Sequence, residues 1–97
     1  MDPDDNVCLC FRVSQRKIVN FLKREKPQHA SAISECLSAG TGCMWCVPFL
    51  RRLHKQVMDG VENPDLPVSP EEYAGRRAKY RKSGVREGVD EDGEIKA

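Results

Sequence analysis

Four of the five cysteines in this 97-residue chain stand in two short pairs. The first pair is Cys8 and Cys10, the second is Cys43 and Cys46, and 32 residues separate the pairs. Residues i and i+2 of an extended segment point to the same side, and residues i and i+3 do so in a turn entering a helix. Each pair can therefore present two sulfur atoms together. Four such thiolates predict a site for zinc or for an iron–sulfur cluster.

Disulfide bonds are the main alternative use of these cysteines. The first six residues, MDPDDN, lack the basic and apolar regions of a secretory signal, which predicts a reducing cytoplasmic location. The cysteine count is also odd. The fifth cysteine, Cys36, shares an expected helix face with Ile33 and Leu37, so we predict a buried free thiol there rather than a ligand.

Short-range sequence signals predict the strand-like segment and the helices that position the two cysteine pairs. Val7 to Phe11 is expected to be a short extended segment, and Ser14 is expected to cap a helix over residues 15–26 that Pro27 ends. The apolar residues of this helix fall on one face, namely Ile18, Val19, Phe21 and Leu22.

Two more short helices are expected before residue 60. One begins at Ala30 or Ser31 and runs to Leu37, before the break at residues 40–42. The other begins near Met44, tolerates Pro48 in its first turn and ends at residues 59–60. The predicted fold class is all-α, a small three-helix domain over residues 7–60 with two cysteine-bearing loops.

The flanking segments are expected to add little to that domain. We predict a disordered acidic leader over residues 1–6, a linker over residues 61–69 and a disordered acidic tail over residues 83–97. Ser69 and Pro70 are a good helix start, so a peripheral helix is expected over residues 70–82. It carries few apolar residues, which favours a solvated extension over a strip packed on the domain.

Composition excludes several functions. The longest apolar run, Cys43 to Leu50, has eight residues, whereas a membrane span needs about 18 to 20. The net charge is +1, and the basic residues are not interleaved with aromatic ones, so we expect no nucleic-acid partner. Residues 7–60 carry nine Lys and Arg against three Asp and Glu, a balance that favours an acidic protein partner.

The sequence also lacks the groupings typical of an enzyme that acts alone. It has no Ser/His/Asp set, no paired buried carboxylates and no phosphate loop. The two histidines, His29 and His54, have no metal-ligand partner at a useful spacing, so both are expected to be structural or exposed.

The spacing leaves the metal open, but a family resemblance narrows the choice. Residues 7–11 (VCLCF), the Ser-x-x-x-Ile of Ser14 to Ile18 and residues 42–46 (GCMWC) resemble the bacterioferritin-associated ferredoxin (Bfd-like) [2Fe-2S]-binding domain over roughly residues 7–58. The resemblance implies a [2Fe-2S] cluster as cofactor. It implies as ligands Cys8, Cys10, Cys43 and Cys46.

By the same resemblance, the chain is expected to be a cytoplasmic electron-transport protein of iron homeostasis. The implied partners are a bacterioferritin, whose stored iron would be reduced for release, and a ferredoxin reductase. Similar domains also occur in other proteins, and this chain continues about 37 residues beyond the domain. Two rival classes therefore stay open, an iron–sulfur scaffold or delivery protein and a zinc-stabilised interaction module.

Overall fold

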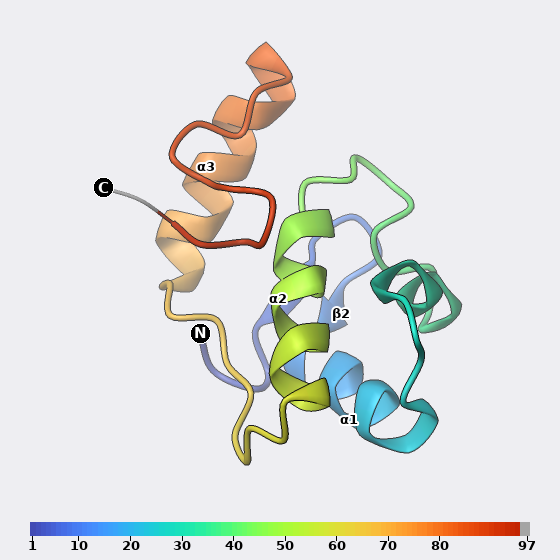
Figure 1. Ribbon diagram of the computed structural model, residues 1–97. Helices are drawn as coiled ribbons and strands as arrows, with labels where there is room; N and C mark the ends of the chain where they lie inside the picture. Colours follow the sequence, from blue (N-terminus) through green and yellow to red (C-terminus); the bar gives the residue numbers. More distant parts are fainter. Residues whose placement is uncertain (96–97) are drawn as a thin grey trace.

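A computed structural model describes residues 1–95 of the chain. The elements follow in the order β1 (Asn6–Cys8), β2 (Val13–Ser14), α1 (Gln15–Glu25), the 3₁₀ helix η1 (Ala30–Glu35), α2 (Val47–Met58) and α3 (Pro70–Ser83). Helix α2 runs through the middle, α1 and η1 lie on one side of it, and α3 lies on the other (Figure 1). Within the described residues, no helix is long and apolar enough to cross a membrane.

The predicted start of α1 is confirmed. The Ser14 hydroxyl accepts a hydrogen bond from the backbone N–H of Lys17, 3.2 Å away, as an N-cap residue does. The helix ends at Lys26, which adopts a left-handed conformation with φ of 43°. The apolar face predicted for this helix is buried, and it faces α2 and η1.

The expectation of an all-α fold is wrong in one respect. The fold is mostly helical, but β1 and β2 pair as a two-stranded antiparallel sheet. An extended segment was expected over Val7 to Phe11, but the strand ends at Cys8 and residues 9–12 form the turn of a hairpin. The partner strand was not expected, because two residues give no alternating pattern and Ser14 also caps α1. The hairpin reverses at Arg12, whose φ is 53°.

The other two helices of the domain also differ from their expected form. The second element is a 3₁₀ helix, and no side chain caps its start. Helix α2 begins at Val47 rather than near Met44, because Met44 has a φ of 67° and lies outside the helical region. Pro48 does stand in the first turn, as predicted.

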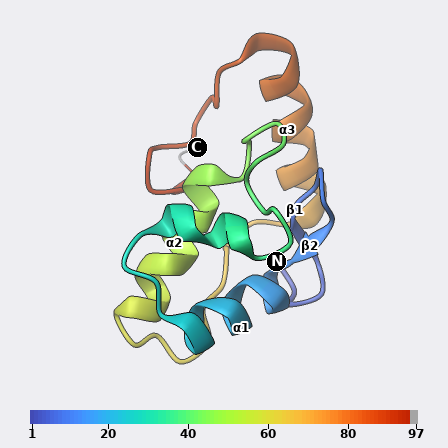
Figure 2. The ribbon, with the colours of Figure 1, turned by 90° about the vertical axis from the view of Figure 1, so that its right-hand side faces the viewer.

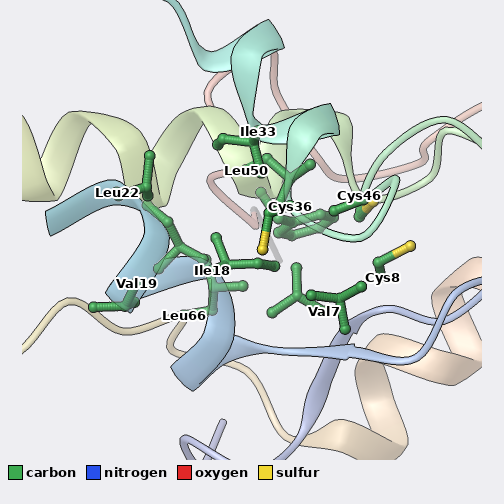
Figure 3. Close-up of a cluster of buried hydrophobic side chains, with 14 of the residues drawn as sticks. Val7, Cys8, Ile18, Val19, Leu22, Ile33, Cys36, Cys46, Leu50 and Leu66 are labelled. Atoms are coloured by element: carbon green, nitrogen blue, oxygen red, sulfur yellow. The ribbon is translucent and has the colours of Figure 1, made fainter. Parts of the chain in front are cut away.

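The core includes residues that we had assigned to a linker. Leu66 is fully buried and Val68 nearly so, against a cluster that contains Val19 and Leu22 of α1 (Figure 3). The buried side chain of Gln15 holds this segment in place, because it accepts from the N–H of Leu66 and donates to the carboxylate of Asp65. Residues 61–69 are therefore part of the packed structure and do not separate two independent parts.

The expectation that residues 70–82 form a solvated extension is also wrong. Ser69 caps α3 as predicted, by accepting from the N–H of Glu72 at 3.1 Å. Tyr73 of this helix is only 1% exposed, and its hydroxyl donates to the backbone carbonyl of Val7 at 2.6 Å. Figure 2 shows α3 beside the β1–β2 hairpin and the loop that precedes α2. Tyr73 thus attaches this helix to the domain, although most of the other residues of the helix are exposed.

Both ends of the described chain have defined contacts, although we expected them to be disordered. The amino group of Met1 donates to the carbonyl of Leu66 at 2.9 Å. In the tail, Val89 pairs with Ile95 in an isolated bridge, and both pack against the core. Gly93 is buried so closely against α2 that an added Cβ would lie 2.6 Å from the Pro48 carbonyl oxygen. The expected tail extends to residue 97, and residues 96–97 lie outside the described part.

Candidate metal centre

The structure brings the two cysteine pairs together. The first pair lies in the β1–β2 hairpin, and the second lies in the loop that leads into α2. A small pocket is lined by all four predicted ligands, by other residues of the two cysteine segments and by one residue of α3; its lining is Cys8, Leu9, Cys10, Gly40, Gly42, Cys43, Met44, Trp45, Cys46 and Arg77. Arg77 belongs to α3, so the site draws on a helix that we had expected to lie apart from it.

The inner side of the pocket holds Cys8 and Cys46. Both thiols are buried, and in Figure 3 they lie at the edge of the apolar cluster. Burial raises the pKa of the Cys46 thiol to about 12, and the neighbouring Cys8 thiol contributes to the same shift. Two adjacent thiols in a place with little solvent favour metal binding, because a metal ion compensates the charge that burial alone disfavours.

The outer side of the pocket holds Cys10 and Cys43. The Cys10 side chain is exposed, and its sulfur accepts the backbone N–H of Cys43 at 3.3 Å and Nη2 of Arg77 at 3.2 Å. These donors lower the pKa of Cys10, with the Cys43 N–H as the largest cause and the Arg77 guanidinium as a further one. Cys10 is thus the member of the set that is prepared to be a thiolate.

The loop between residues 40 and 46 fits closely around the sulfur atoms. A Cβ added to Gly42 would lie 2.7 Å from Cβ and 2.8 Å from Sγ of Cys10, so only glycine leaves room for that side chain. The positive φ of Met44 turns the chain between Cys43 and Cys46, and the Met44 side chain is left 53% exposed. Helix α2 starts directly after Cys46, so the positive end of its dipole lies at the site.

Unpartnered donors on residues of the pocket lining provide a test of whether an electron-rich group fits there. The Nε1 atom of Trp45 and the Nε atom of Arg77 are buried and have no hydrogen-bond partner among residues 1–95. Buried N–H groups are rarely left unpaired. Sulfur atoms of a bound cluster would accept from such donors, so the donor set fits a thiolate-held anion.

The geometry is that of two thiol pairs, one buried and one at the surface. In the described part of the chain, no three His, Cys, Asp or Glu side chains converge around one point as a single metal ion requires. A [2Fe-2S] cluster is held by four cysteines, two for each iron. Four cysteines line this pocket, which is the number that such a cluster requires.

The remaining candidates lie away from the pocket, as predicted. Cys36 is buried, its sulfur points into the apolar cluster toward Ile18 (Figure 3), and its thiol lies 3.8 Å from the Lys17 carbonyl oxygen. Burial raises the pKa of this thiol. The His54 ring makes a hydrogen bond of 2.7 Å with the carbonyl of Pro27, which is a structural role, and His29 is exposed.

Sequence reasoning missed the residues of α3 that complete the site. Tyr73, Arg77 and Tyr80 follow each other at i, i+4 and i+7, which places them on one face of the helix. The Tyr80 hydroxyl donates to the carbonyl of Cys43 at 2.8 Å. This spacing was visible in the sequence, but three residues in an otherwise polar helix did not indicate what they would contact.

Four thiols around a pocket with spare N–H donors define a metal-binding protein of the iron–sulfur or zinc class. The comparison with protein families decides between these: the BFD-like [2Fe-2S] binding domain family matches residues 6–56, more than half of the chain. The chain belongs to this family, and its cofactor is a [2Fe-2S] cluster. Comparisons with curated proteins and with solved structures give no significant match.

The opposite pKa shifts predict selective alkylation of the cluster-free protein. A lowered pKa gives Cys10 more thiolate at neutral pH, and the raised pKa of Cys46 keeps that thiol protonated until far higher pH. Iodoacetamide at pH 7 should therefore label Cys10 first and Cys46 last, as measured by peptide mass spectrometry. In urea the difference should disappear, whereas equal labelling of the folded protein would contradict the shifts.

Proposed function

We propose that this protein is a single-electron carrier. The observation that supports this best is that four thiols line one pocket in a chain of the [2Fe-2S] binding domain family. The proposed ligands are Cys8, Cys10, Cys43 and Cys46. When bound, a [2Fe-2S] cluster supplies a one-electron couple at this position. The protein itself holds the group, shields its inner side and supplies N–H donors to its sulfur ligands.

The outer side of the site suits electron exchange with another protein. Cys10 is exposed, and two apolar side chains beside the ligands are exposed as well, Phe11 at 48% and Met44 at 53%. Exposed apolar residues next to a redox centre favour brief docking of a partner. The inner thiols are covered by the core, so a partner approaches from the side of Cys10 and Cys43.

The proposed partners are a bacterioferritin, whose ferric iron would be reduced for release, and a ferredoxin reductase that supplies the electrons. The resemblance to bacterioferritin-associated ferredoxins is the support for these partners. Residues 7–60 carry an excess of basic residues, which favours a partner with an acidic docking surface. We propose that catalysis belongs to the partners and that this chain is not itself an enzyme.

The test begins with protein purified without oxygen. It should contain about two irons and two acid-labile sulfides per chain, as four cysteine ligands of one [2Fe-2S] cluster require. Photoreduced protein is then mixed with iron-loaded bacterioferritin and a ferrous chelator in a stopped-flow instrument. We expect the carrier to be oxidised at the same rate as ferrous iron is released. The visible spectrum of its cluster should be recovered over repeated cycles of reduction and oxidation.

A scaffold or delivery protein would behave differently in the same experiment. It would lose its iron and sulfide to an apo-protein acceptor, and its own visible spectrum would fade irreversibly. Such transfer, or a cluster that accepts no electron, would refute the carrier proposal. Reversible reduction without iron release from bacterioferritin would refute only the choice of partner.

A further inference from the structure

Arg77 places a permanent positive charge against one proposed ligand of the cluster. Its Nη2 atom lies 3.2 Å from the sulfur of Cys10, 67 positions away in the sequence. The contact comes from α3, which lies entirely outside residues 6–56 that match the family. The family match therefore says nothing about this residue.

The neighbouring residues of α3 fix the helix on both sides of Arg77. Tyr73, one turn before it, donates to the carbonyl of Val7, the residue that precedes Cys8. Tyr80, almost one turn after it, donates to the carbonyl of Cys43. The helix is thus bonded to the backbone of both cysteine segments, and Arg77 lies between the two anchors.

Aromatic packing strengthens the same attachment. The ring of Trp45, a residue of the second cysteine segment, lies 5.6 Å from the ring of Tyr73 and 5.7 Å from the ring of Tyr80, centre to centre. Trp45 is only 1% exposed. The backbone that carries Arg77 is therefore held in a fixed position relative to the site.

The guanidinium of Arg77 still has a free donor. Its Nε atom is buried without a partner among residues 1–95, while its Nη2 atom bonds to Cys10. Arginine presents its N–H groups in a rigid fork, which suits two acceptors on one side. A second sulfur acceptor of the loaded site would satisfy the free Nε–H.

Arg76, the next residue on the same helix, shows that not every arginine of α3 is used in this way. Its Nε and Nη2 atoms lie 3.1 Å and 3.0 Å from the Glu72 carboxylate, and it also bonds to the carbonyl of Glu87. Its charge is compensated within the helix, and it is absent from the lining of the cysteine pocket. It is a matched control.

We propose that Arg77 is a positioning residue of the metal centre that favours the reduced form. This inference rests on the proposed function, because it takes Cys10 as a ligand. One-electron reduction adds negative charge to the site, and a guanidinium bonded to a ligand sulfur stabilises the more negative form. Removal of Arg77 therefore lowers the reduction potential, so a residue beyond the family domain contributes to that potential.

The experiment compares three full-length loaded variants, Arg77→Met, Arg77→Lys and Arg76→Met, with the wild type. The readout is the reduction potential from anaerobic titration, followed by visible and electron paramagnetic resonance spectra. In Arg77→Met we expect the equilibrium constant for reduction to fall by about tenfold, which lowers the reduction potential by about 59 mV for one electron. Arg77→Lys should recover part of the loss, since it keeps the charge, and Arg76→Met should stay near the wild type.

An unchanged potential in Arg77→Met with a full complement of iron and sulfide would overturn the inference. Equal shifts in Arg77→Met and Arg76→Met would overturn it as well, because they would reflect net charge alone. If Arg77→Met loses its cluster, Arg77→Lys decides: a potential below that of the wild type, with full iron and sulfide, supports the inference, and a wild-type potential overturns it. A wild type without reversible reduction would refute the proposed function instead.

Discussion

Replacement of Cys46 by serine is expected to abolish the cluster and to lower thermal stability. The thiol is buried beside Cys8, and burial holds its pKa near 12, so a hydroxyl in its place is a poor ligand with little solvent to compensate. Thiolate–metal binding in small domains contributes on the order of 10 kcal/mol. Each kcal/mol lost lowers Tm by about 4–8 °C in a domain of this size. Iron and sulfide analysis and calorimetry measure the two effects.

Cys36→Ala is the matched control for that variant. Cys36 is also a buried free thiol, but its sulfur faces the apolar cluster and it does not line the cysteine pocket. We expect this variant to keep its iron, sulfide and visible spectrum. Its thermal stability should fall only by the small amount that a shortened core side chain costs. Retention of a full cluster in Cys46→Ser, or its loss in Cys36→Ala, would show that the ligand set is different.

The second large effect is expected from a chain that ends at Val68. This variant keeps the buried Leu66 and Val68 but lacks α3, so it uncovers Trp45 and removes the hydrogen bond from Tyr73 to the carbonyl of Val7. The loss of such a hydrogen bond alone costs about 0.5–1.5 kcal/mol. Mutation of residues that contact metal ligands commonly lowers metal affinity or activity about 10–100-fold. We therefore expect the cluster to decay in air about ten times faster or more than in the wild type. The decay is followed by visible absorbance.

A chain that ends at Gly88 is the control for the deletion. It keeps α3 and Arg86, whose guanidinium donates to the carbonyls of Met44 and Trp45. Its cluster should decay at close to the wild-type rate. If the two truncated chains decay equally fast, the last residues of the tail protect the site and α3 does not; if neither differs from the wild type, α3 gives no protection.

Local signals in the sequence predicted the parts of the site that depend on neighbouring residues. The spacing within each cysteine pair, the cap at Ser14 and the break at residues 40–42 each act over a few positions, and each appears in the structure. The spacing did not show which metal is bound, because thiolates at this spacing hold zinc as well as iron–sulfur clusters. Only the match to the family identified the [2Fe-2S] cluster.

The contribution of α3 could not be predicted in the same way. Tyr73 bonds to Val7 over 66 positions, and Arg77 bonds to Cys10 over 67. A helix with one fully buried residue gives almost no amphipathic pattern, because most of its surface is solvated. The tail was misjudged for a similar reason, since its acidic composition is typical of disorder while its attachment depends on the close approach of Gly93 to Pro48.

The attachment of α3 also has a consequence for how the protein is made. The chain is synthesised from its N-terminus, so both cysteine pairs leave the ribosome before Tyr73, Arg77 and Tyr80 emerge and can cover them. During that interval the pocket is open on the side that α3 later occupies. Until α3 packs, the four thiols are more accessible than in the finished protein, and this helix then covers one side of the site.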